Sequence, residues 1–366
     1  MNGLWGMVVT GVGIAAILGG IYLTWTIGKF SGIKRITKES RLLKIVIPLL
    51  ILGAGFAFFC VTMSPINAVI VLIHLMLFRL IFGIIGFVVK KIRGKESELY
   101  WQGWGALIFC TLYLGIAFFT CNHVFSTVYN LDTYKAIGNL KIVMFADSHI
   151  GTTFDGEGFM KEVEKINEEK PDIVFICGDF IDDGTNKEDM LKACEALGNL
   201  KTKYGVFYVY GNHDKGYNRN YRGYSASDFE FNLMLNKVRV LQDKVMEIDN
   251  NIVIVGRADA SNNARKSIGE LTKDIDDDKY IIVLDHQPHD YENEAASKSD
   301  LVLSGHTHGG QFFPLTVIGL SPNDRTYGYE KRNGTDFIVT SGISDWELKF
   351  KPGTKSEYVV IYVKGR

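Results

Sequence analysis

The first third of this sequence contains very few acidic residues. Before Tyr129, only Glu39, Glu96 and Glu98 are acidic, against eleven Lys and Arg residues. The whole chain of 366 residues has 40 basic and 41 acidic residues, so the remainder has 29 basic and 38 acidic ones. The first part is therefore +8 and the rest −9, a split that indicates a membrane part joined to a soluble part.

The sequence also lacks the features of disulfide-rich, repeat and nucleic-acid-binding proteins. The five cysteines include no pair with the spacing of metal ligands, so we expect no disulfide framework. The sequence has no internal repeat and no low-complexity segment. The acidic part offers no broad basic face, so we expect no nucleic-acid partner.

Four long apolar runs are each long enough to cross a bilayer core of about 30 Å. They predict transmembrane helices near residues 4–28, 45–64, 68–89 and 103–121, within a membrane region at 1–122. No basic start precedes the first run, as one would in a signal peptide, so we expect this run to be retained. The alternative is four buried helices of a soluble protein, but these runs leave no polar face for water.

The loops between the runs differ in charge. Loops 29–44 and 90–100 are basic, whereas 64–67 and the segment after 121 are not. Because basic residues concentrate in cytoplasmic loops, the pattern predicts a multi-pass protein of the cell membrane. Both termini and the soluble part would lie outside the cytoplasm.

One charge interrupts the third run. Arg79 lies near its middle, where a charged group costs about 2.5–3.5 kcal/mol on insertion scales. No Asp or Glu occurs in any of the four runs. The remaining partners for Arg79 are backbone carbonyls, water or a lipid phosphate. The simpler alternative is that the additional spans only stabilise a membrane anchor.

From residue 140 the pattern changes to short apolar strands that alternate with amphipathic helices, after a predicted linker at 123–139. This alternation indicates an α/β domain over residues 140–366. The expected strands are 141–146, 171–177, 205–210, 237–241, 244–248, 252–256, 280–284, 300–303, 336–341 and 357–363. The expected helices are 156–169, 187–199, 226–235 and 265–273.

Polar clusters follow five of the expected strands. Ligands of open α/β sheets bind beyond the carboxyl ends of strands. Alone, each cluster could be a helix cap or a turn, but five in sequence are hard to explain in that way. Carboxylate, amide and imidazole ligands suit divalent metals such as Mn, Fe or Zn, and there are more of them than one ion needs. The clusters are Asp147-Ser148-His149, Gly178-Asp179 with Asp182, Gly211-Asn212-His213-Asp214, Asp285-His286 and Gly305-His306-Thr307-His308.

In this order the clusters resemble the motifs of the calcineurin-like metallophosphoesterases. The stretch from Gly305 to Gln311, with His286-Gln287-Pro288, resembles the bacterial membrane-associated YkuE branch most. The resemblance covers residues 140–366 and implies a four-layer α-β-β-α sandwich, which the strand pattern alone does not distinguish from a single sheet. It also implies two divalent metal ions.

The same resemblance implies a role for each site residue. One ion would be held by Asp147, His149 and His308, and the other by Asn212, His286 and His306, with Asp179 as the bridge. His213 would protonate the leaving oxygen, and Asp182 would orient His213.

The function expected from this resemblance is hydrolysis of phosphomonoesters or phosphodiesters by a hydroxide that two metals activate. The substrate could be lipid-linked, with membrane lipids as further partners. Two alternatives are a pyrophosphohydrolase of a lipid-linked nucleotide diphosphate and a membrane sensor of metal or phosphate. Relatives often have Gly-x-Asp-Asp where this chain has Gly256-Arg257-Ala258-Asp259, which weakens inference about the substrate loops. Candidate pocket residues, or else solvated loop residues, are Arg219, Tyr221, Arg222, Arg325, Tyr327 and Tyr329.

Overall fold

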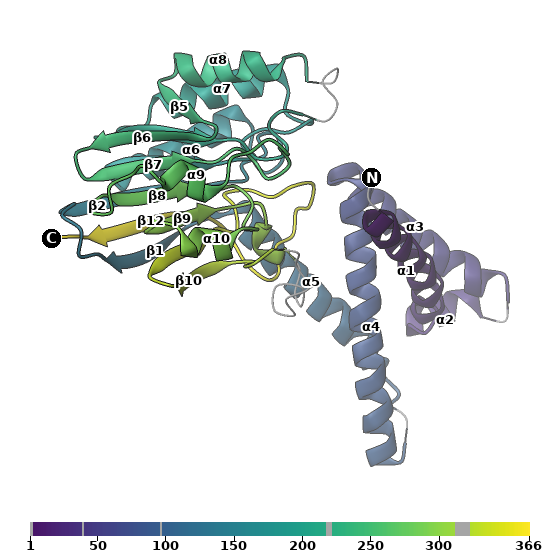
Figure 1. The fold of residues 1–366 in the computed structure, drawn as a ribbon. Helices are drawn as coiled ribbons and strands as arrows, with labels where there is room; N and C mark the ends of the chain where they lie inside the picture. The colour runs from purple at the N-terminus through teal and green to yellow at the C-terminus, as the bar shows by residue number, and fades with distance from the viewer. Residues whose placement is uncertain (1–2, 39, 96, 217–221, 312–322) are drawn as a thin grey trace. The chain divides into compact units, whose positions relative to one another are not determined.

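The computed structural model describes residues 3–38, 40–95, 97–216, 222–311 and 323–366. The chain folds as two compact units, Met1–Ile116 and Ala117–Arg366. The first is helical and the second contains all the strands among the described residues (Figure 1).

Four long apolar helices match the four apolar runs, and the last of them begins in the first unit and ends in the second. These are α1 (Gly3–Ile27), α3 (Leu43–Thr62), α4 (Pro65–Arg93) and α5 (Trp101–Asn122), and all four are long and apolar enough to cross a membrane. Only 6% of the apolar window of α3 and 28% of that of α5 are buried by protein. A bilayer is the solvent that covers such surfaces.

Local sequence explains where α4 begins and ends. Ser64 caps its first turn by accepting a hydrogen bond from the backbone N–H of Asn67, and Pro65 occupies the first helical position, where no N–H is needed. Gly94 ends the helix in a left-handed conformation with φ 71°. The basic loop before α3 contains a short helix, α2 (Ser31–Thr37), which the sequence pattern did not predict.

The second unit is built on two six-stranded sheets. The first sheet has the order β1-β12-β2-β3-β4-β5, and the second has the order β10-β11-β9-β8-β7-β6. The strands of the first sheet are β1 (Val124–Asp132), β2 (Asn139–Phe145), β3 (Ile173–Cys177), β4 (Gly205–Val209), β5 (Val238–Leu241) and β12 (Ser356–Lys364). Those of the second are β6 (Lys244–Asp249), β7 (Ile252–Gly256), β8 (Tyr280–Leu284), β9 (Leu301–Ser304), β10 (Gly328–Arg332) and β11 (Thr335–Val339).

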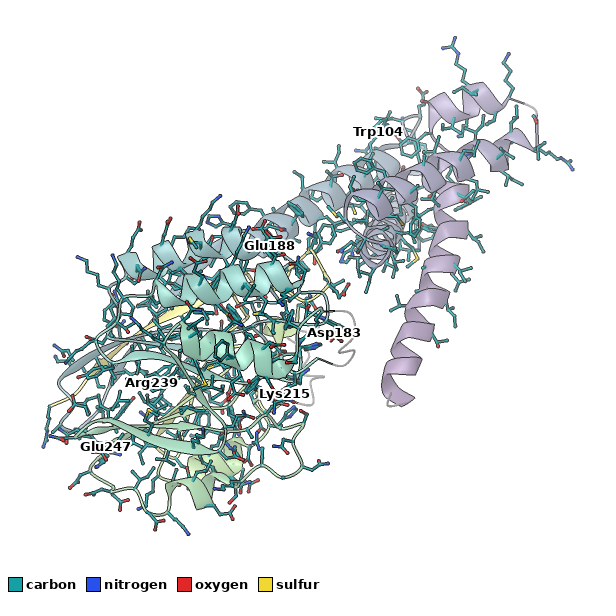
Figure 2. All side chains as sticks on the ribbon, turned by 90° about the horizontal axis from the view of Figure 1, so that it is seen from above. Trp104, Asp183, Glu188, Lys215, Arg239 and Glu247 are labelled. Carbon is teal, nitrogen blue, oxygen red and sulfur yellow. The ribbon has the colours of Figure 1, made fainter. Side chains whose placement is uncertain are left out.

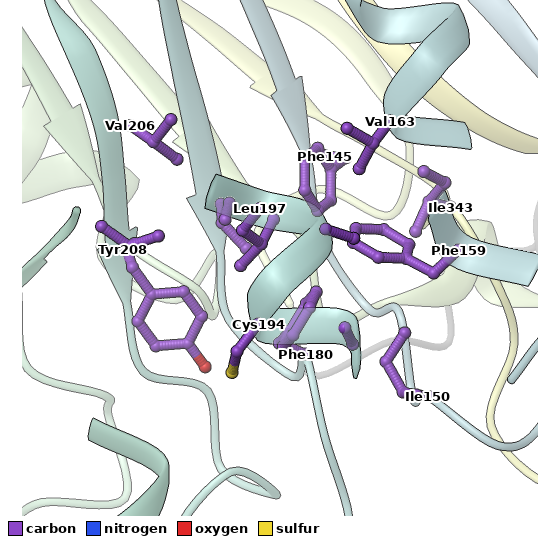
Figure 3. Close-up of a cluster of buried hydrophobic side chains, with 14 of the residues drawn as sticks. Phe145, Ile150, Phe159, Val163, Phe180, Cys194, Leu197, Val206, Tyr208 and Ile343 are labelled. Carbon is purple, nitrogen blue, oxygen red and sulfur yellow. The ribbon is translucent and has the colours of Figure 1, made fainter. Parts of the chain in front are cut away.

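The two sheets pack face to face with helices outside. Alternate side chains of β2 divide between two cores: Ile142 and Met144 enter the core between the sheets, while Val143 and Phe145 enter the core beneath the helices. The latter core includes Phe159 of α6 (Gly156–Glu168) and Leu197 of α7 (Lys187–Gly198) (Figure 3).

Three further helices complete the outer layers. Helix α8 (Ala226–Leu235) adds Phe229 to the same core. On the second sheet, α9 (Ile268–Thr272) and α10 (Tyr291–Ala296) cover a third core with Leu271 and Tyr291. The predicted four-layer α-β-β-α sandwich is therefore confirmed.

Two strands were missed from the sequence. Residues 124–132, expected within a linker, form β1, which pairs in parallel with β12 from Val124 opposite Ser356 to Asp132 opposite Lys364. The strand lies at the sheet edge and alternates polar and apolar residues, so it lacks the continuous apolar signal of the inner strands. Strand β10, an edge strand with the sequence GYEKR, lacks that signal too.

The topology brings the polar clusters to one end of the sandwich. Strands β2, β3 and β4 are parallel neighbours, as are β8 and β9 in the other sheet. The loops after these strands carry the five polar clusters. Asp183 and Lys215 mark the loops after β3 and β4 in Figure 2.

Candidate metal centre

Two groups of possible metal ligands lie at this end of the sandwich. Asp147, His149 and His308 offer ligand atoms that all lie within 4.8 Å of one another. Asp179, His286 and His306 form a second group by the same measure. Asn212 joins the second group, since its Oδ1 lies 3.3 Å from His286 Nε2. The structure thus brings together all seven residues expected to bind metal.

A single carboxylate oxygen faces both groups. Asp179 Oδ2 lies 3.1 Å from His286 Nε2 and 3.9 Å from His149 Nε2. The side chain of Asp179 is almost fully buried, so this oxygen has little access to bulk water. Its position between two imidazoles is the arrangement that a bridging ligand needs.

The backbone of the site is strained. Asp147, Asp179, His149, His306 and His308 have φ values of 55°, 51°, 37°, 70° and 48°, in the left-handed region that non-glycine residues rarely adopt. Such strain persists only where the surrounding structure enforces it, and it clusters at functional sites. Five of the seven candidate ligands therefore occupy costly conformations.

Two glycines allow the loops to approach closely. A Cβ at Gly305 would lie 2.5 Å from Ala146 Cβ and 2.7 Å from Asp147 Oδ2. A Cβ at Gly211 would overlap Asp179. The glycines of these motifs thus make room for the carboxylates beside them.

Hydrogen bonds behind the histidines fix which ring nitrogen faces the site. His149 Nδ1 lies 3.1 Å from Asp182 Oδ2, and His286 Nδ1 donates to the carbonyl of Cys177 at 2.7 Å. The Nε2 atom of each ring is left facing Asp179. His149 Nε2 is buried and has no hydrogen-bond partner among the described residues, and a buried imidazole nitrogen with no partner fits a metal ligand.

The carboxylate of Asp182 contacts a candidate metal ligand, with Oδ2 3.1 Å from His149 Nδ1. The role expected of Asp182, to orient His213, stays a prediction. Asp182 therefore lies behind a candidate metal ligand. His213 itself is positioned through its backbone N–H, which donates to Asp179 Oδ1 at 2.8 Å, and its ring centroid lies 5.2 Å from that of His149.

Sequence reasoning missed Asp345. This fully buried carboxylate lies in the loop after β11, with Oδ1 3.0 Å from His308 Nδ1. Trp346 follows it and places its ring 5.3 Å from that of His213. The signal was available in principle, because this is a sixth polar cluster after a strand, but it lies six residues beyond Val339 and matches no motif.

Two further buried residues hold the loops. The carboxylate of Asp214 accepts hydrogen bonds from four backbone N–H groups in the loops after β3 and β4. Arg222 donates to the carbonyls of Asp182, His213 and Asp214. Arg222 was a candidate for the substrate pocket, but its guanidinium is committed to fixing these loops.

Three of the other pocket candidates contact neighbouring carboxylates. Arg219 and Tyr221 lie outside the described residues. Arg325 pairs with Glu330, Tyr327 donates to Glu357, and Tyr329 donates to Asp336. Contacts with neighbouring carboxylates therefore account for these three side chains.

The unusual Arg257 has its own partners. Its guanidinium is buried and lies 2.9 Å from Asp285, 2.8 Å from Asp290 and 3.0 Å from Glu294. Arg265 also contacts Asp285, at 2.9 Å. Because Asp285 precedes His286, this network fixes the start of the loop that carries a candidate ligand.

The electrostatics of the site favour a cation. Burial would lower the pKa of His149 and His286, but the buried carboxylates Asp182 and Asp179 outweigh it, and the pKa of each imidazole is raised. Burial also opposes ionisation of Asp179, yet the neighbouring His286 holds its pKa below the ordinary value. Burial lowers the pKa of His306 to about 3, which keeps this imidazole in the neutral form that binds metal. The donor set therefore fits divalent cations.

The chain resembles known proteins over its α/β unit. The family model Metallophos, described as calcineurin-like phosphoesterase, matches residues 140–310. An uncharacterized metallophosphoesterase of Aquifex aeolicus is 32% identical over 252 residues, which cover 65% of this chain and 91% of that protein. The uncharacterized metallophosphoesterase YkuE of Bacillus subtilis is 27% identical over 237 residues, covering 61% of this chain and 79% of YkuE.

Other matches cover less of the relative. A Danio rerio protein named "Transmembrane protein with metallophosphoesterase domain" is 29% identical over 248 residues, covering 63% of this chain and 54% of that protein. The chain spans about 60% of the length of two further bacterial relatives, from Campylobacter jejuni and Helicobacter pylori.

Proposed function

We propose that this chain, which belongs to the calcineurin-like metallophosphoesterase family, is a membrane-bound phosphoesterase with a two-metal site. The observation that carries the proposal is the position of Asp179 Oδ2, 3.1 Å from one imidazole and 3.9 Å from another, between two groups of ligands. A site for a single ion would not need a second group.

In this proposal the ligands divide as the family resemblance implies. Asp147, His149 and His308 would hold one ion, and Asn212, His286 and His306 would hold the other, with Asp179 as the shared ligand. The ligand types indicate the class of metal, because imidazole and carboxylate suit Mn, Fe or Zn. Bound there, two such cations would neutralise charge on the phosphoryl oxygens and make water a stronger acid.

The protein supplies position and protons. The five strained loop residues and the hydrogen bonds of Asp182 and Cys177 fix the imidazoles before any substrate arrives, and such preorganisation supplies much of the rate in phosphoryl transfer. His213 lies beside His149 and is not needed as a ligand, so it can donate a proton to the leaving oxygen.

The membrane arrangement is a second part of the proposal. Four membrane-length helices and two basic loops support a multi-pass protein whose loops 29–44 and 90–100 lie in the cytoplasm. The α/β unit then lies outside the cytoplasm. Residues 1–116 are the membrane part in this view, and the α/β part includes β1 in place of a free linker.

The test is an assay of the purified full chain. It would be supplied with Mn, Fe or Zn and given monoesters, diesters, diphosphates and lipid phosphates in turn. We expect metal-dependent release of phosphate or alcohol from at least one class, and loss of both metal and turnover in Asp179→Asn. Asp277→Asn, which changes a carboxylate with 79% side-chain exposure, is the matched control. Metal-independent turnover, or full activity of Asp179→Asn, would refute the proposal.

A further inference from the structure

A cavity lies among the helices of the first unit. Its volume is about 450 Å³, within the range of roughly 300–1,000 Å³ typical of ligand pockets. It is lined by apolar side chains such as Leu23, Phe56, Leu72 and Trp104 (Trp104 is labelled in Figure 2). All its lining residues lie within Met1–Ile116. An apolar cavity of this kind accommodates a hydrocarbon chain.

The cavity wall includes one charged side chain. Arg79 lines it and is 95% buried, with 5% exposure. One terminal nitrogen donates to the carbonyl of Gln102 at 2.8 Å, and the other donates to the hydroxyl of Tyr100. The Nε–H group is buried with no hydrogen-bond partner among the described residues. These neutral acceptors satisfy part of the donor set but leave the charge uncompensated.

Among the described residues, no carboxylate forms an ion pair with Arg79. The sequence has no Asp or Glu at positions 1–38, 40–95 or 99–131. Instead, Lys29 and Lys34 flank the stretch Phe30–Ile33, all four residues of which line the cavity. The cavity therefore has an apolar wall and an excess of positive charge, the complement of an anionic amphiphile.

We propose that this cavity binds one phosphate-bearing lipid, with a hydrocarbon chain against the apolar wall and its phosphate at Arg79. A guanidinium presents planar N–H donors that match phosphate oxygens two at a time. The lipid phosphate supplies the acceptor that Nε–H lacks and the negative charge that the described contacts of Arg79 do not provide. This site shares no residue with the metal centre, and it stands whether or not the chain is a phosphoesterase.

The contact between Arg79 and the lipid phosphate is tested by measuring lipid binding to the purified full-length protein in detergent. Bound phosphatidylglycerol and phosphatidylcholine would be counted by native mass spectrometry. We expect wild type to prefer phosphatidylglycerol, and Arg79→Gln to lose roughly tenfold or more of that affinity, because a hydrogen-bonded charge is removed. Arg79→Lys should retain part of the preference. Arg93→Gln, at the exposed end of the same helix, should bind as wild type does.

Binding of the hydrocarbon chain is tested at two glycines of α3. Gly55 lines the cavity and Gly53 does not, and a Cβ at either position meets nothing within 4 Å. Gly55→Leu should therefore fill the cavity and displace the lipid, while Gly53→Leu should leave binding unchanged. This pair keeps the test valid even if Arg79→Gln fails to fold, which gel filtration would reveal.

Three results would overturn the proposal. They are equal lipid binding by wild type and Arg79→Gln, equal binding by Gly55→Leu and Gly53→Leu, and displacement of the lipid by millimolar inorganic phosphate. The last result would identify a site for free phosphate, since a lipid held by its chain is not displaced by the phosphate group alone.

Discussion

Replacing Asp214 by asparagine should unfold the metal-binding loops, although it only exchanges one carboxylate oxygen for an NH₂ group. Oδ2 of Asp214 accepts hydrogen bonds from the N–H groups of Asp179 at 2.9 Å and Gly211 at 2.6 Å. Oδ1 accepts from those of Phe180 at 2.9 Å and Ile181 at 3.2 Å. Both oxygens are thus occupied by two donors each, in a side chain with 0% exposure.

The size of the effect follows from this count. In Asp214→Asn an NH₂ group replaces one oxygen, and whichever way the amide turns, two backbone N–H groups face a donor. Each buried donor left without an acceptor costs about 1–3 kcal/mol, so the expected loss is about 2–6 kcal/mol. That is a large part of the roughly 5–15 kcal/mol that stabilises a domain, and it corresponds to a fall in Tm of roughly 5–20 °C.

The assay is calorimetry of the purified full chain, with metal content measured on the same samples. Asp277→Asn is the control, because an exposed ion pair contributes only about 0–1 kcal/mol. Asp214→Asn should also bind less metal, since the loops it joins carry both Asp179 and Asn212. A Tm within about 2 °C of the control, with full metal content, would mean that the carboxylate does not hold these loops.

Three further predictions concern the site and its side of the membrane. His213→Ala should keep both metal ions by elemental analysis but lose turnover by roughly 10²–10⁴-fold, and less for substrates with acidic leaving groups; loss of an ion would contradict its role as the acid. Gly305→Ala should lower metal content, because the new Cβ would lie 2.5 Å and 2.7 Å from neighbouring side chains, whereas Gly269→Ala, with open space around it, should not. In intact cells a cysteine at Asp277 should react with a membrane-impermeant thiol reagent and one at Ser40 only after lysis; the reverse pattern would place the α/β unit in the cytoplasm.

The sequence predicted the inner strands well because burial on both faces gives a continuous apolar run. Strands β3, β7 and β8 lie within the predicted ranges, and each is fully buried. The edge strands β1 and β10 were missed, since half-exposed strands alternate and their polar residues resemble a loop. Helix α10, with six residues, is too short to show a helical period.

The sequence also predicted the candidate metal ligands but not the residues that contact them from behind. Residues that must appear in fixed order after consecutive strands leave a motif, and the structure brings those seven together. Residues that contact a metal-binding histidine on the side away from the metal leave no motif, because any segment of the chain that lies near the histidine can supply them. Asp182 illustrates the same limit, because the motif identified the residue but did not predict its contact with His149.

Asp345 is the clearest case of such a residue, and its removal should weaken one metal group selectively. Its carboxylate lies 3.0 Å from His308 Nδ1 and 3.9 Å from the buried Lys351 Nζ. Loss of a partner behind a metal-binding histidine typically costs about 10–100-fold in metal affinity. Asp345→Ala alone would also leave Lys351 buried without this carboxylate, so the variant to test is Asp345→Asn with Lys351→Met. We expect it to retain the ion of the Asp179–His286 group and lose the other in a titration with chelator. Equal loss of both ions, or of neither, would show that Asp345 does not act through His308.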